Sequence, residues 1–164
     1  MKKLVIFALV LSMIVAVFSG CATTPKQFAG EWRFAGISKV ELVSDVSEDS
    51  IDQLMQVYGA EDEAGIEANA LASFTADGTF APCYVSFDKK YTYTYDPIME
   101  REATWVFYQT GDNEGFLSFY AELDAADGNP DPRNNPDVVY NAETDTLYVT
   151  INYSVFMVTV ELSR

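Results

Sequence analysis

The chain has 164 residues, of which 49% are hydrophobic and 14% aromatic, a composition typical of one folded domain. Its 25 acidic residues outnumber its 10 basic residues, and the formal net charge is −15. After residue 20 the only adjacent basic pair is Lys89-Lys90, which argues against nucleic acid as a partner. The chain has no histidine, so Ser-His-Asp and Cys-His catalysis and histidine-ligated zinc are excluded. We expect no catalytic activity, no cofactor and no bound metal.

The first 20 residues are typical of an export signal. Lys2 and Lys3 form a positive start, and residues 4–18 are apolar except for Ser12. A membrane-spanning helix needs about 20 apolar residues, so this shorter run favours a signal peptide that is cleaved. We therefore predict a signal at residues 1–20, a tether at residues 21–27 and one domain at residues 28–164.

The end of this segment resembles the lipobox of bacterial lipoproteins. Ser19 and Gly20 are small residues directly before Cys21, although Phe18 stands where the family usually has leucine. The resemblance implies that Cys21 is acylated, with palmitate among the expected chains, and anchors the protein to the membrane of the cell envelope. Ala22 follows the cysteine where aspartate would favour inner-membrane retention, which implies the outer membrane if the cell has one. An ordinary secretory signal with a chance cysteine is the alternative.

The first predicted strand covers residues 32–43, where apolar and charged residues alternate. The face expected to point inward comprises Trp32, Phe34, Gly36, Ser38, Val40 and Leu42.

A helix is predicted next, over residues 50–58. Its apolar residues follow the i, i+3, i+4, i+7 spacing of one helix face: Ile51, Leu54, Met55 and Tyr58. Ser50 and Gln53 form a capping-box pattern, and Gly59 lies where a helix-ending glycine belongs. A second short helix within residues 61–69 is left open.

The rest of the chain predicts short antiparallel strands. Asp77-Gly78 indicates a hairpin turn, and Cys83, Val85 and Phe87 then share one buried face. Further strands are expected at residues 91–95, 103–109 and 115–123, followed by a polar loop at 125–136. Two strands flank residues 142–145, and a change of parity near Ser154 predicts a final turn or bulge. The total is eight to ten strands.

The motif at Gly30 and Trp32 resembles the Gly-x-Trp that opens the first strand of lipocalins, where the tryptophan closes one end of the barrel. With the lipobox, the short tether and Asp77-Gly78, the chain looks like the small lipocalin-like lipoproteins of bacteria. The resemblance implies an antiparallel up-and-down, calycin-like barrel. The helices expected after the first strand instead resemble those of fatty-acid-binding proteins, where they form a lid.

The chain departs from the lipocalin pattern in two ways. The second motif, Thr-Asp-Tyr, is absent, and Arg164 is the only late candidate for the arginine that packs on the tryptophan. A β-sandwich or an open curved sheet is therefore the alternative fold.

Aromatic residues are the candidates for binding a ligand. Tyr93 and Tyr95 alternate along one predicted strand, and Trp105 and Phe107 along another. If these side chains face inward, they line an apolar pocket in which the hydroxyl groups orient a ligand. The alternative is that they form ordinary core or cross-strand contacts on the sheet surface.

The leading hypothesis is a non-enzymatic binding lipoprotein that holds a small apolar or amphipathic ligand. The alternative is an interaction module of the cell envelope with a solid core, whose protein partners the sequence does not identify. Paired carboxylates carry little weight in so acidic a chain, and residues 124–131 do not fit the EF-hand pattern of calcium ligands.

Overall fold

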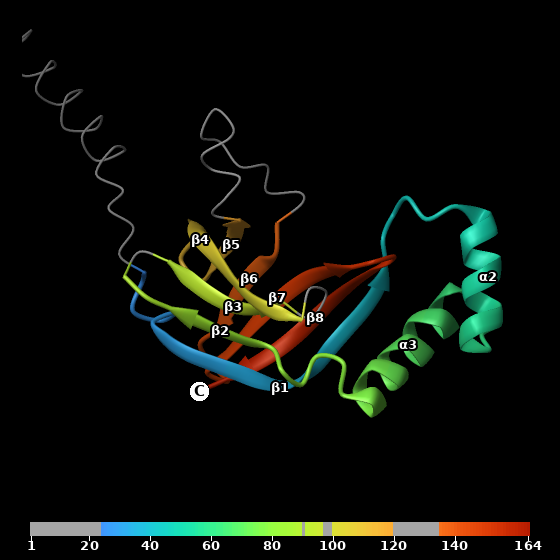
Figure 1. Ribbon diagram of the computed structural model, residues 1–164, viewed down its shortest axis with the longest axis horizontal. Helices are drawn as coiled ribbons and strands as arrows, with labels where there is room; N and C mark the ends of the chain where they lie inside the picture. Colours follow the sequence, from blue (N-terminus) through green and yellow to red (C-terminus); the bar gives the residue numbers. More distant parts are fainter. Residues whose placement is uncertain (1–23, 90, 97–99, 120–134) are drawn as a thin grey trace, which may run out of the picture.

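The computed structural model describes residues 24–89, 91–96, 100–119 and 135–164 (Figure 1). Within them, eight antiparallel strands form a closed barrel in which each strand pairs with its neighbours in sequence and β8 pairs with β1. The strands are β1 (Gly30–Leu42), β2 (Tyr84–Phe87), β3 (Thr92–Asp96), β4 (Arg101–Gly111), β5 (Glu114–Phe119), β6 (Asp137–Asn141), β7 (Thr146–Tyr153) and β8 (Phe156–Ser163). The predicted up-and-down barrel is confirmed, and the sandwich and open sheet are ruled out.

Two β-bulges shape β1 and change the face that was predicted for it. The register with β8 shifts once between Phe34 and Gly36 and again just after Ile37. As a result Ile37, and not Gly36, packs against the core, while Ser38 is exposed. The two shifts cancel, so the last part of the strand returns to the predicted parity.

The helix α2 (Glu48–Tyr58) follows β1, as predicted, but begins earlier than the capping-box pattern indicates. Its N-cap is Ser47, whose hydroxyl accepts a hydrogen bond from the Ser50 amide at 3.3 Å. Ser50 is therefore inside the first turn. The predicted end is confirmed, because Gly59 adopts the left-handed conformation, with φ of 63°, that closes the helix.

The hairpin predicted at Asp77-Gly78 is wrong. A second helix, α3 (Glu63–Asp77), occupies this segment, and Gly78 is its C-cap with φ of 64°. The glycine does supply a positive φ, but it ends a helix and does not turn a hairpin. The alanine-rich run before it has high helix propensity, and helix packing outweighs the local turn signal.

Packing against the barrel anchors α3. Ile66, Ala70 and Phe74 lie one turn apart on its buried face, and the Glu67 carboxylate accepts a hydrogen bond from the Leu42 amide at 2.9 Å. Figure 1 shows that α2 and α3 lie beyond the end of the barrel at which β1 finishes.

The C-terminal half follows the predicted order of strands and turns. The strands β6 and β7 flank residues 142–145, and Ser154, with φ of 61°, turns β7 into β8. Cys83, Val85 and Phe87 are all buried, as predicted. The strand expected at residues 115–123 appears as β5, and its continuation beyond residue 119 lies outside the described residues. Residues 125–134 of the predicted polar loop, the signal and Cys21 also lie outside them.

In the described part of the chain, no helix has the length and apolar character needed to cross a membrane.

Gly115 tests the packing of the barrel wall. A Cβ atom there would lie 2.5 Å from Cε2 of Phe107, so we expect Gly115→Ala to lower the free energy of unfolding by about 2 kcal/mol or more. In the matched control, Gly36→Ala, the nearest atom is Oε2 of Glu161 at 3.8 Å, and the expected change is within about 0.5 kcal/mol. Urea denaturation measures both values, and equal losses would contradict the packing described.

Candidate functional site

Five aromatic rings fill the end of the barrel at which β1 begins. Phe28, just before β1, is fully buried, and its ring centroid lies 4.8 Å from that of Phe107 and 5.7 Å from that of Phe87. The Tyr140 ring is 6.1 Å from Phe28, and the indole Nε1 of Trp32 donates to the Phe28 carbonyl at 2.9 Å. We call these five residues the aromatic floor.

Arg164 packs against the outer side of the aromatic floor. Its Cζ lies 4.3 Å from the centroid of the Trp32 ring, its Nη1 donates to the Ala29 carbonyl at 3.1 Å, and its Nη2 is 2.7 Å from Oδ1 of Asp145. The hydrogen bond from Arg164, with a second one from Tyr140, keeps the pKa of Asp145 below its usual value. This is the arginine-on-tryptophan contact for which the lipocalin resemblance left Arg164 as the candidate.

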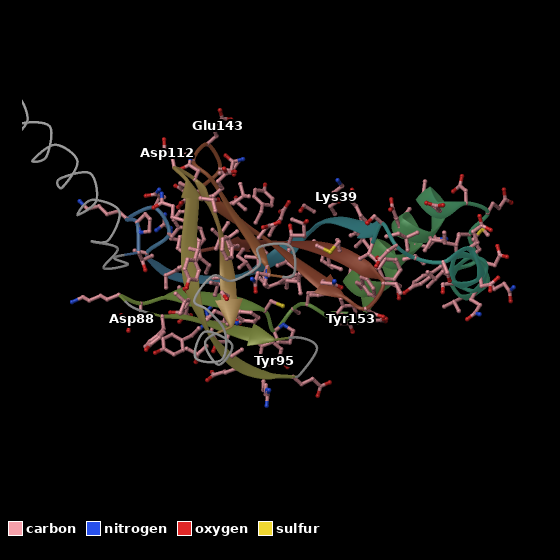
Figure 2. All side chains as sticks on the ribbon, turned by 90° about the horizontal axis from the view of Figure 1, so that it is seen from above. Lys39, Asp88, Tyr95, Asp112, Glu143 and Tyr153 are labelled. Carbon is pink, nitrogen blue, oxygen red and sulfur yellow. The ribbon has the colours of Figure 1, made fainter. Side chains whose placement is uncertain are left out.

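A second aromatic cluster lies at the opposite end, beside the helices. The Phe74 ring of α3 lies 5.7 Å from Phe80, 5.6 Å from Tyr153 and 5.7 Å from Phe156. Tyr153 is labelled in Figure 2 near the junction with the helices. Here α3 covers the rim formed by the end of β7 and the start of β8.

The wall formed by β2, β3 and β4 contributes both aromatic and smaller side chains to the interior. Register places two rows of inward-facing residues across these strands: Phe87, Thr92 and Trp105 next to the floor, and Val85, Thr94 and Ala103 one step further from it. On these three strands the second row contains no aromatic residue, although the indole of Trp105 reaches Thr94 and Trp32 of β1 lies opposite Val85.

Two hydroxyl groups face the interior from this wall. Oγ1 of Thr94 accepts a hydrogen bond from Nε1 of Trp105 at 2.8 Å, whereas the buried Oγ1 of Thr92 has no hydrogen-bond partner within the described chain. Among the residues that the structure describes, the buried polar side chains are those of Thr92, Thr94 and Ser118, and none is ionisable. The interior is thus apolar and uncharged, with hydroxyls concentrated on β3.

The four predicted ligand-binding residues do not lie on one face. Trp105 and Phe107 point inward, with Phe107 buried in the aromatic floor. Because Thr92 and Thr94 occupy the inward positions of β3, the alternating Tyr93 and Tyr95 point outward, and Tyr93 is 39% exposed. Their part in ligand binding stays a prediction, and the structure does not bring all four together.

The predicted barrel-closing pair lies at the floor. Trp32 is fully buried beneath Arg164, and Gly30 has a φ of 114°, a conformation that side-chain-bearing residues rarely adopt.

The outer face of β2 to β4 carries polar aromatic residues. The hydroxyl of Tyr84 donates to Oε1 of Glu102 at 2.6 Å, and this hydrogen bond raises the pKa of Tyr84 to about 12. Tyr93 pairs with Thr104 on the same surface. These contacts fit an ordinary cross-strand surface.

No metal centre is visible in the parts of the chain that are described, since no group of three or more potential ligand residues gathers there. The ion pairs between Arg33 and Glu31 and between Lys39 and Glu41 are exposed, and they belong to the outer face of β1. This arrangement offers binding by shape and hydrogen bonds.

Sequence reasoning missed Phe28, Thr92 and Thr94. Phe28 is a lone aromatic residue in a polar segment, which was the available signal that it inserts into the domain. For β3 the alternation of threonine and tyrosine was visible, but nothing local indicates which set faces the interior.

Comparison with known proteins gave no match: no family model, curated protein or solved structure is significantly similar to this chain. The closed eight-stranded barrel is compatible with a lipocalin-like fold, and that likeness rests on architecture and on the Trp32–Arg164 contact.

The contact of Arg164 with Trp32 should stabilise the barrel. We expect Arg164→Ala to lower the free energy of unfolding by about 1–2 kcal/mol, because it removes a stacked cation and hydrogen bonds to backbone carbonyls. Arg164→Lys keeps the charge but loses the planar group, so its loss should be intermediate. The control is Arg33→Ala, which changes an arginine whose side chain is 74% exposed. Equal losses for Arg33 and Arg164 in thermal denaturation would contradict the role of the stacking.

Proposed function

We propose that the protein is a lipid-anchored, non-enzymatic binding protein of the bacterial cell envelope that holds a small apolar or amphipathic ligand inside its barrel. The observation that carries this proposal is the uneven interior. Aromatic rings block one end, while Val85, Thr94 and Ala103 face inward from the β2–β4 wall beside the unpaired hydroxyl of Thr92. A largely apolar site with a few polar groups is typical of small-molecule pockets in barrels.

Anchoring through Cys21 would set the orientation of the barrel. Thr24 donates a hydrogen bond to the Asp88 carbonyl at 2.8 Å, and Gln27 donates to the Asp112 carbonyl, so this stretch is attached to the floor end of the barrel. Asp88 and Asp112 lie at the end opposite the helices (Figure 2). Cys21 precedes Thr24 by three residues, a reach of about 10 Å. The aromatic floor would then face the membrane and the helices would point away from it.

The second candidate is an interaction module with a solid core. It is supported by the aromatic clusters at both ends of the barrel and by α2, which has no buried residue and exposes Val57 at 76%. An exposed apolar side chain on an acidic helix suits a protein partner, but one such residue is common on any surface.

A substitution that places a larger side chain inside the barrel distinguishes the two candidate functions. Ala103 faces inward opposite Thr94, and the adjacent Thr104 faces outward opposite Tyr93. If the barrel holds a ligand, Ala103→Phe should fold and abolish saturable binding of the neutral fluorophore N-phenyl-1-naphthylamine, while Thr104→Phe should bind as the wild type does. A solid core predicts no saturable binding by any variant and a loss of about 1–3 kcal/mol for Ala103→Phe from overpacking.

The anchor is tested by Cys21→Ser. Because acyl chains attach at the thiol, we expect the variant to leave the membrane fraction as a soluble protein or to accumulate unprocessed. Membrane fractionation with a carbonate wash measures the change, with Ser19→Ala as a control that keeps the cysteine. A processed Cys21→Ser protein that stays tightly membrane-bound would refute the lipoprotein assignment.

A further inference from the structure

The hydroxyl of Thr92 is the one buried side-chain polar atom in the described chain without a hydrogen-bond partner. Thr92 is 1% exposed, lies opposite Phe87 on β2 and opposite Trp105 on β4, and points into the barrel. A buried hydroxyl without a partner is unfavourable, and native proteins retain few of them. Thr92 lies directly beside the aromatic floor, opposite its member Phe87.

Thr94 offers a second hydrogen-bonding group on the same face. Its oxygen accepts the indole Nε1–H of Trp105 at 2.8 Å, which holds the oxygen in place and leaves the hydroxyl hydrogen to donate to another group. On a strand, the α-carbons of residues i and i+2 are about 6.6 Å apart. Hydrogen bonds from both threonine hydroxyls can therefore reach one small polar group that lies between them.

The surroundings restrict the charge of that group. Val85 and Ala103 flank Thr94, and among the described residues no buried side chain facing this site is charged. Arg164 is already engaged by Trp32 and Asp145 outside the floor. An anionic carboxylate would lose its hydration here without gaining a cation, and the chain's net charge of −15 adds repulsion.

We propose that Thr92 and Thr94, with Trp105 positioning Thr94, form a polar subsite that binds the neutral oxygen-bearing head group of an apolar ligand, such as an ester carbonyl or an alcohol. The apolar chain of this ligand lies along the wall at Val85 and Ala103, towards the helix end. This inference rests on the proposed ligand-binding function and names the class of ligand.

The test compares four probes that share a twelve-carbon chain, on delipidated full-chain protein carrying Cys21→Ser. Dodecanol, methyl laurate, laurate and dodecane each compete with N-phenyl-1-naphthylamine. We expect dodecanol and methyl laurate to bind at least about tenfold more tightly than dodecane, and the laurate anion at pH 8 to bind more weakly than both. Tighter binding of laurate than of dodecanol would overturn the neutral head group.

Three variants locate the subsite. Thr92→Val and Thr94→Val should each reduce the preference for dodecanol over dodecane by about tenfold and leave dodecane binding unchanged. Thr104→Val, on the outer face, should keep the full preference. If dodecanol binds but the threonine variants keep its preference, the subsite is wrong while the proposed function stands. If no probe binds the wild type, both are wrong.

The unliganded protein gives an independent measurement. Replacing an unsatisfied buried hydroxyl with a methyl group of similar shape removes its unfavourable burial, so Thr92→Val should raise the Tm by about 3 °C. Thr104→Val should not raise it. A lower Tm for Thr92→Val would show that the hydroxyl is already satisfied in the unliganded protein, and would overturn the subsite.

Discussion

The barrel depends on the double pairing of β1. This strand pairs with β2 over its first four residues and with β8 from Arg33 to Leu42, so it is the strand that closes the sheet. A regular strand would keep one face along its whole length, but the interior of a closed barrel curves away from it. The bulges on either side of Ile37 let β1 follow this curvature while Trp32 stays in the floor and the far end reaches α3.

Patterns spanning several residues predicted most of this architecture. Alternation located the strands, Gly59 the end of α2, and the change of parity at Ser154 the last hairpin. These signals are reliable because each depends on backbone geometry that few residues tolerate. Gly78 shows the limit of such reasoning. A positive φ is required in a helix cap as in a hairpin, and here the helix propensity of the preceding residues and the packing of Phe74 against β8 favour the cap.

The site was harder to predict because a barrel strand has two faces that both accept aromatic residues. Along β3 the larger tyrosines face outward and the smaller threonines inward. A rule that places the more apolar set inside fails here, since the floor already fills the nearby interior with Phe28 and Phe107. Bulge positions and the docking of Phe28 depend on contacts far apart in sequence, so no local pattern could reveal them.

The aromatic floor limits how a ligand could enter the barrel. Phe28 seals the floor end, and Arg164 fixes that seal by binding both Trp32 and the backbone before β1. Opening this end would break several ring contacts and hydrogen bonds at once. At the other end α3 packs on the rim formed by β7 and β8, so entry from the helix side would leave the contacts of the floor intact. With the proposed anchor at Cys21, the ligand would therefore be exchanged on the side that faces away from the membrane.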